Sequence, residues 1–158
     1  MTPDIDAILA LDLLTLRDHT ERAGDVFDAD THRRRLEQAL PACEVVAVRR
    51  GEALVAYAML RPHDDACWFV LGFNTHPQHR DGGVFRDLFA QLAALAQRRS
   101  ITSLRSNVYK TNRLSMAFHR RLGFAVTREN AKGVEFTADL AALMSASSAV
   151  GRARRRHP

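Results

Sequence analysis

The stretch Thr75-His76-Pro77-Gln78-His79-Arg80-Asp81-Gly82-Gly83-Val84-Phe85 joins two segments of different pattern. Before it, residues 67–73 are apolar on both faces, which predicts a buried central strand. After it, residues 84–98 carry their apolar side chains on one stripe, which predicts an amphipathic helix packed on a sheet. Glycines at such a junction let the backbone approach an anion, and the free N–H groups of the first helical turn stabilise phosphate. The stretch therefore predicts a pyrophosphate cradle, although Asp81-Gly82-Gly83 is also typical of a plain turn.

The segments on either side predict an alternation of helices and strands. Towards the N-terminus, the apolar spacing predicts two helices and a hairpin, over residues 4–18, 33–40, 43–49 and 53–60. Towards the C-terminus, it predicts a strand, a helix, a second hairpin and a short helical end, over residues 101–108, 112–122, 124–127, 134–137 and 139–144. This order indicates an α/β (α+β) fold with a mixed sheet and helices on its faces.

Length and composition limit the possible classes. A chain of 158 residues with 46% apolar and 26% charged side chains is typical of one globular domain, which we expect over residues 1–150. No apolar run approaches the roughly 20 residues of a membrane-spanning helix, so no membrane partner is expected. The first ten residues lack the basic start of a secretory signal, and we expect a cytoplasmic protein.

The formal charge of +5 is concentrated at the C-terminus. Four arginines occupy the last seven residues, so the body without the tail of residues 151–158 is nearly neutral. We expect this tail to be disordered, and we treat nucleic-acid binding through it as a minor alternative. Cys43 and Cys67 cannot form a disulfide framework and are interpreted as buried free thiols. The His and Cys residues show no ligand spacing, so no metal is expected.

Two motifs resemble those of the GNAT superfamily of acetyl-CoA-dependent N-acyltransferases. The first is Arg80-Asp81-Gly82-Gly83-Val84-Phe85, and the second runs from Asn112 through Phe118-His119 to Gly123-Phe124. They occur in the family's order and at plausible spacing, and the resemblance covers about residues 44–137. It implies a mixed, mostly antiparallel sheet with a central strand splay and helices on both faces.

The resemblance also implies a reaction and a site. The reaction is attack by a primary amine of a small molecule, amino acid or peptide on the thioester of acetyl-CoA, the cosubstrate. The implied catalytic residues are Asn74, beside a backbone N–H for the oxyanion, and His119. The implied cofactor-binding residues lie on the central strand, the cradle and the second motif: Phe73, Thr75, His79, Arg80, Asp81, Gly82, Gly83, Val84, Phe85, Asn112 and Ser115.

His119 stands where the family usually has tyrosine, the proton donor to the thiolate. At about 100° per residue, Asn112, Ser115 and His119 share one polar helix face, so we predict that His119 is the acid. The alternative is a packing histidine in an enzyme that protonates the thiolate through water. No general base is evident on the central strand, and weak candidates lie in the neighbouring turns: Glu44, Glu52, His63, Asp64 and Asp65.

Two further departures from the family pattern leave alternatives open. Phe85 replaces a small residue at the helix start, and the N-terminal segment shows no opening strand. The same fold could therefore serve as a non-catalytic module that senses acyl-CoA.

The loops at residues 18–31 and 61–65 are expected to contact the acceptor, whose identity the sequence does not give. A homodimer is possible, and the sequence does not decide it.

Overall fold

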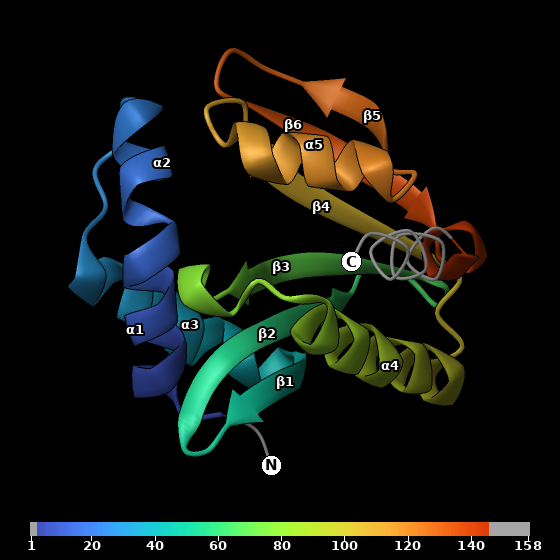
Figure 1. The fold of residues 1–158 in the computed structure, drawn as a ribbon. Helices are drawn as coiled ribbons and strands as arrows, with labels where there is room; N and C mark the ends of the chain where they lie inside the picture. The colour runs from blue at the N-terminus through green and yellow to red at the C-terminus, as the bar shows by residue number, and fades with distance from the viewer. Residues whose placement is uncertain (1–2, 146–158) are drawn as a thin grey trace, which may run out of the picture.

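A six-stranded sheet runs through the molecule, and helices lie against both of its faces (Figure 1). The computed structural model describes residues 3–145. The strands are β1 (Glu44–Arg50), β2 (Ala53–Pro62), β3 (Cys67–Thr75), β4 (Ser103–Tyr109), β5 (Ala125–Glu129) and β6 (Gly133–Asp139). The helices are α1 (Ile5–Thr15), α2 (Arg17–Arg22), α3 (Ala29–Ala39), α4 (Gly82–Arg99) and α5 (Arg113–Arg121), with the short turns η1 (Leu40–Ala42) and η2 (Pro77–His79). Among the described residues, no helix combines the length and the hydropathy needed to cross a bilayer.

The sheet follows the predicted mixed and mostly antiparallel plan. Its strand order is β1-β2-β3-β4-β6-β5, and only the pair β3–β4 is parallel. Within the described residues, the first strand begins at Glu44, and the segment before it is helical. The predicted C-terminal helical end is also present, since residues 140–145 are helical and bury Leu140 and Leu143.

The two central strands separate before they end. β3 pairs with β4 only from Cys67, opposite Ser103, to Val70, opposite Ser106. On its other edge β3 stays paired with β2 as far as Thr75. The divergence therefore leaves the β4-facing edge of residues 71–75 without a strand partner. Figure 1 shows the opening at the carboxyl ends of both strands, and α4 and α5 begin at this same end.

The pairing of β3 with β2 shows which N–H groups of β3 point into this opening. His76 N donates to Val55 O on β2, at 2.7 Å. Because peptide groups alternate along a strand, the N–H of Asn74 also faces β2, whereas those of Phe73 and Thr75 face the opening. Two main-chain donors are thus available in the middle of the molecule.

Two apolar cores fix this arrangement. One joins α4, α5 and the C-terminal segment to one face of the sheet, with Val84, Leu88 and Phe136 fully buried. The other lies between the opposite face of the sheet and helices α1 and α3, with Ile8, Leu11 and Leu36 buried. The opening between β3 and β4 lies between these two cores.

Several local predictions need correction. The helix predicted over residues 4–18 breaks at Leu16, and α2 follows as a separate helix. α3 begins at Ala29 rather than at residue 33, because the carboxylate of Asp28 caps it and accepts the N–H of Asp30. The middle of β3 is only half-buried, since β4 leaves its side there. Cys67 is buried as predicted, but Cys43 is half-buried.

The helix α5 also presents a different face from the one predicted. The apolar spacing within residues 112–122 predicts that Leu114 points inward, but Leu114 is 61% exposed, while Met116 and His119 are buried. The polar face inferred from Asn112, Ser115 and His119 therefore does not act as one surface, because its last member points into the core.

Candidate active site

The opening between β3 and β4 continues into a cavity of about 470 Å³. Its floor is Phe73, Asn74 and Thr75 of β3, and its walls come from the first half of α4, the whole length of α5, and α1 and α2. The predicted site residues that line it are Phe73, Asn74, Thr75, Arg80, Gly82, Phe85, Asn112 and Ser115. Phe118 of the second motif also lines it, together with residues that were not predicted for the site: Thr15, His19, Phe89, Leu114, Ala117, Arg121 and Leu122.

The apolar part of this cavity is built largely from aromatic rings. Phe73 lies 5.9 Å from Phe118 and 6.3 Å from Phe89, centroid to centroid. Phe85, the residue that replaces a small one in the first motif, lies 5.4 Å from Phe118. Phe85 therefore narrows the space beside the start of α4 and adds to an aromatic wall between α4 and α5.

The loop before α4 was predicted to be the pyrophosphate cradle, and its amides are only partly free. Asp81 caps the helix: its Oδ1 accepts from Val84 N at 2.9 Å, and its carboxylate also accepts the N–H of Gly83. These hydrogen bonds, led by the one from Val84, lower the pKa of Asp81. Within the described chain the N–H of Gly82 has no such partner, and a Cβ built at Gly82 meets no atom within 4 Å. Gly82 thus leaves open space at the cavity edge.

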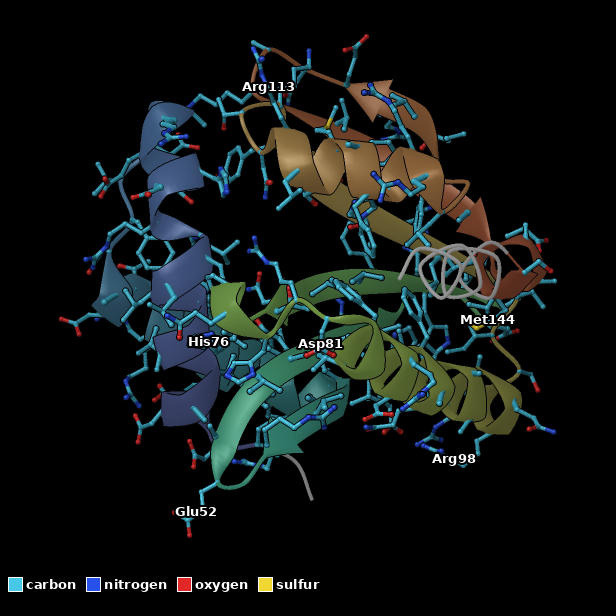
Figure 2. All side chains as sticks on the ribbon, in the orientation of Figure 1. Glu52, His76, Asp81, Arg98, Arg113 and Met144 are labelled. Atoms are coloured by element: carbon cyan, nitrogen blue, oxygen red, sulfur yellow. The ribbon has the colours of Figure 1, made fainter. Side chains whose placement is uncertain are left out.

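The remaining cradle residues have different surroundings. Arg80 lies at the cavity edge, where its Nε donates to Thr75 Oγ1 at 3.2 Å. Val84 is fully buried in the core, and His79 packs against His76 with ring centroids 5.1 Å apart. Figure 2 shows His76 and Asp81 along the segment between β3 and α4, with Arg113 beyond the gap at the start of α5.

Asn74 is held by a buried network that crosses four elements. Its Nδ2 donates to Asp12 Oδ1 at 2.5 Å, and Tyr57 Oη donates to the same oxygen at 2.6 Å. His32 Nε2 donates to the other carboxylate oxygen of Asp12 at 2.7 Å. Asp12 is 1% exposed, so these three donors replace its hydration. Burial, followed by the charge of Asp12, raises the pKa of Tyr57 well above its usual value.

The network also depends on Gly72. A Cβ built at Gly72 would lie 2.8 Å from Tyr57 Oη and 2.9 Å from Tyr57 Cε2. A larger residue would therefore displace the Tyr57 ring from Asp12. The glycine in β3 creates the room in which Tyr57 and Asn74 reach the same carboxylate.

His119 lies outside the large cavity. It is 8% exposed, and its ring stacks on Phe136 at 4.9 Å and meets Phe124 edge-on at 4.9 Å. Its Nδ1 donates to Ser115 O at 2.7 Å, and its Nε2 lies 3.2 Å from Ser106 Oγ. Burial lowers the pKa of His119, so the ring is neutral near pH 7 and Nε2 accepts from the serine. These contacts favour the packing alternative over the proton-donor prediction.

The weak candidates for a general base lie elsewhere. His63, Asp64 and Asp65 precede β3, whereas the cavity is at its far end, about 25 Å away at 3.3 Å per residue. The expected contact of residues 61–65 with the acceptor therefore does not occur at this cavity. Asp64 instead accepts the N–H of Cys67 at 2.7 Å. Glu44 pairs with Arg99, and neither Glu44 nor Glu52 lines the cavity.

A family model provides the first comparison with known proteins. The model described as the Acetyltransferase (GNAT) family matches residues 10–124, well over half of the chain. The chain belongs to the GNAT acetyltransferase family. The predicted family and fold are thereby confirmed. No curated protein sequence matches this GNAT acetyltransferase significantly.

Solved structures resemble this GNAT domain in fold. The PaiA N-acetyltransferase of Thermoplasma acidophilum, in complex with coenzyme A, superposes with a TM-score of 0.68 at 12% identity, covering 86% of this chain and 92% of that one. The ribosomal-protein-S18-alanine N-acetyltransferase of Escherichia coli gives 0.66 at 15% identity, over 89% and 90%. An aminoglycoside 6'-acetyltransferase type Ii gives 0.66 at 17% identity, over 86% and 89%. At these identities the likeness concerns the fold.

One signal in the sequence of this GNAT domain pointed to the missed network. Asp12 follows Ile8 by four residues and Ile5 by seven, so it occupies the apolar stripe of α1. A carboxylate at such a position predicts buried partners. Its partners His32, Tyr57 and Asn74 are 20 to 62 residues away, and no sequence spacing identifies them.

Proposed function

We propose that this protein transfers an acetyl group from acetyl-CoA to a primary amine by direct attack on the thioester. The observation that carries the proposal is the divergence of β3 and β4 beneath the cavity of about 470 Å³. The two N–H groups that face the opening, on Phe73 and Thr75, are fixed donors of the kind that stabilises an oxyanion. An opening between strands also gives an extended thioester arm a straight path to these donors.

The residues present fit the cosubstrate. The aromatic wall of Phe73, Phe85 and Phe118 suits a flexible chain of mixed polarity. At the start of α4, the free N–H of Gly82 and the guanidinium of Arg80 are the donors for a diphosphate. Asn112 and Ser115 lie at the opposite wall, and the Asn112 side chain already accepts the N–H of Ser115 at 3.0 Å.

The chemistry assigns distinct tasks to the residues of the chain. The amine nitrogen attacks the carbonyl carbon, a C–N bond forms, and the carbonyl oxygen becomes an oxyanion held by main-chain N–H groups of β3. The nitrogen, which is cationic after the attack, gives up one proton, and the C–S bond breaks. The sulfur leaves as a thiolate that takes a proton from water. Asn74, fixed by Asp12, presents its amide oxygen as an acceptor for the incoming amine.

The proposal is tested by binding and turnover measured together. Calorimetry with acetyl-CoA should show saturable binding, and a panel of amines, amino acids and peptides should include at least one that releases free thiol. Arg80→Gln should weaken acetyl-CoA binding about tenfold. Arg98→Gln, at the far end of α4 in Figure 2, is the matched control and should leave binding unchanged. Saturable binding without thiol release from any amine would favour the acyl-CoA sensor, and absence of binding would refute both.

A further inference from the structure

His19 is the one residue lining the cavity, among those that the structure describes, whose side chain takes up a proton near neutral pH. The other charged groups of the lining are the guanidinium groups of Arg80 and Arg121. No aspartate or glutamate of the described chain lines it. His19 is therefore the only side chain of this lining, among the described residues, that can accept a proton released inside the cavity near neutral pH.

The position of His19 is fixed by the backbone around it. It lies in the last turn of α2, and Thr111 Oγ1 donates to its carbonyl at 3.1 Å. That hydrogen bond ties α2 to the segment that joins β4 to α5, across the mouth of the opening. Figure 1 shows α2 beside the start of α5.

The ring of His19 has an unused hydrogen-bonding atom. Its Nδ1 is buried and has no partner in the described part of the protein. Buried polar atoms without a partner are rare in folded proteins, and water or a ligand usually completes their hydrogen bonding. In His19 this atom belongs to a ring that faces the proposed acyl-transfer site.

The charged neighbours favour a neutral ring. Burial lowers the pKa of His19, Arg22 lowers it further, Asp18 raises it, and Arg80 from the segment before α4 lowers it again. These groups come from α2 itself and from across the cavity, and Thr111 on the remaining side is uncharged. The ring is thus free to accept a proton at pH 7.

We infer that His19 is the proton acceptor for the attacking amine, an inference that rests on the proposed acyl transfer. As the C–N bond forms, the amine nitrogen becomes cationic and acidic, and its proton passes to the His19 imidazole directly or through one bound water. The oxyanion then collapses, the C–S bond breaks, and the imidazolium returns its proton to solvent. No oxidant or further reactant is needed.

The test compares His19→Gln with wild type, using an amine that wild type acetylates. We expect kcat to fall about 100-fold, with KM for acetyl-CoA and its calorimetric affinity unchanged. Wild-type kcat/KM should show an acidic inflection below about pH 6.5, and the variant should lack it. His63→Gln, far from the cavity at the other end of β3, is the matched control and should keep both the rate and the inflection.

A second variant distinguishes a lost proton acceptor from a misfolded protein. His19→Ala should regain part of its rate when imidazole is added, which a purely structural role does not produce. Turnover by His19→Gln within about threefold of wild type, with the inflection retained, would overturn the inference while leaving the proposed function intact. Absence of thiol release from wild type with every amine would instead overturn the proposed function, and the role of His19 with it.

Discussion

The imidazole of His119 has hydrogen-bond partners at both nitrogens and aromatic rings on two sides. A ring in this state has no proton directed towards the cavity. Its neutral form is favoured by burial, which lowers its pKa. A role of His119 in catalysis is tested by replacing it with glutamine, which cannot take up a proton near neutral pH but can still form hydrogen bonds.

We therefore expect His119→Gln to keep kcat within about threefold of wild type. The same variant should alter the acid dependence of stability. A histidine whose folded pKa lies below its unfolded value favours the folded state above the unfolded pKa, and that contribution is lost as pH falls below about 6.5. Urea unfolding at several pH values should show a shallower acid loss in the variant. A fall in kcat of about 100-fold with the fold intact would restore the sequence-based assignment of His119 as the acid.

Asp81 places a carboxylate where a diphosphate is proposed to bind. It caps α4 through Val84, and the charge it brings opposes an anion at the same helix start. Asparagine caps a helix about as well as aspartate and carries no charge. Asp81→Asn should therefore tighten coenzyme A binding about fivefold in calorimetry, and most strongly at low salt.

The control for this change is Glu37→Gln on α3, which removes the same charge from the opposite face of the sheet. It should leave coenzyme A affinity unchanged. Weaker binding by Asp81→Asn would mean that the carboxylate supports the cosubstrate, for example by keeping the loop in place, and would contradict the electrostatic argument.

At the scale of elements, α1 and α3 are joined to the sheet through one buried carboxylate. Asp12 accepts from His32 of α3, Tyr57 of β2 and Asn74 of β3. Because all three donors bind the carboxylate of Asp12, α1 and α3 can dock on β2 and β3 in only one relative position. The network thereby sets both the position of α1 and the orientation of Asn74 at the cavity floor.

Asp12→Ala should destabilise the protein by about 3 kcal/mol, because it leaves buried donors without an acceptor. Chemical unfolding measures this loss, and kcat of the folded fraction should also fall because Asn74 is released. Asp65→Ala, in the exposed turn before β3, is the control and should change stability by less than about 0.5 kcal/mol. A small effect of Asp12→Ala would mean that water replaces the carboxylate.

At the scale of the whole molecule, the divergence of β3 and β4 leaves the two halves of the sheet joined by a short parallel ladder. Contacts beyond the sheet bridge the halves at the open end. Asp25, which follows α2, pairs with Lys132 of the β5–β6 turn and accepts from Tyr109 of β4 at 3.1 Å. A ligand seated between the halves should therefore stabilise the molecule as a unit.

Coenzyme A at about 100 times its Kd should raise the free energy of unfolding by about 2.7 kcal/mol. For a chain of this size, that corresponds to an increase in Tm of roughly 5 to 10 °C by calorimetry. Amide hydrogen exchange should slow in β3 after Val70 and at the starts of α4 and α5. Protection confined to other elements would place the ligand outside the opening.

Local signals in the sequence were enough to predict most of the elements, the family and a glycine-containing loop at the cavity. Hydrophobic period, glycines at a strand–helix junction and two ordered motifs each lie within about a dozen residues. Thus Phe73, Arg80 and Gly82 were expected at the site, and they line the cavity. The tail of residues 151–158 lies outside the described residues and stays a prediction.

Which side chains meet depends on tertiary packing. Helical spacing put His119 on a face with Asn112 and Ser115, but only packing against β4 and β6 turns its ring into the core. Likewise, no local pattern brings His19 of α2 to the cavity or Asp12 to Asn74, because such contacts depend on how the helices dock across the sheet. Docking is set by the burial of apolar area over the whole chain, a non-local quantity, so the environment of each titratable group emerges only in the folded state.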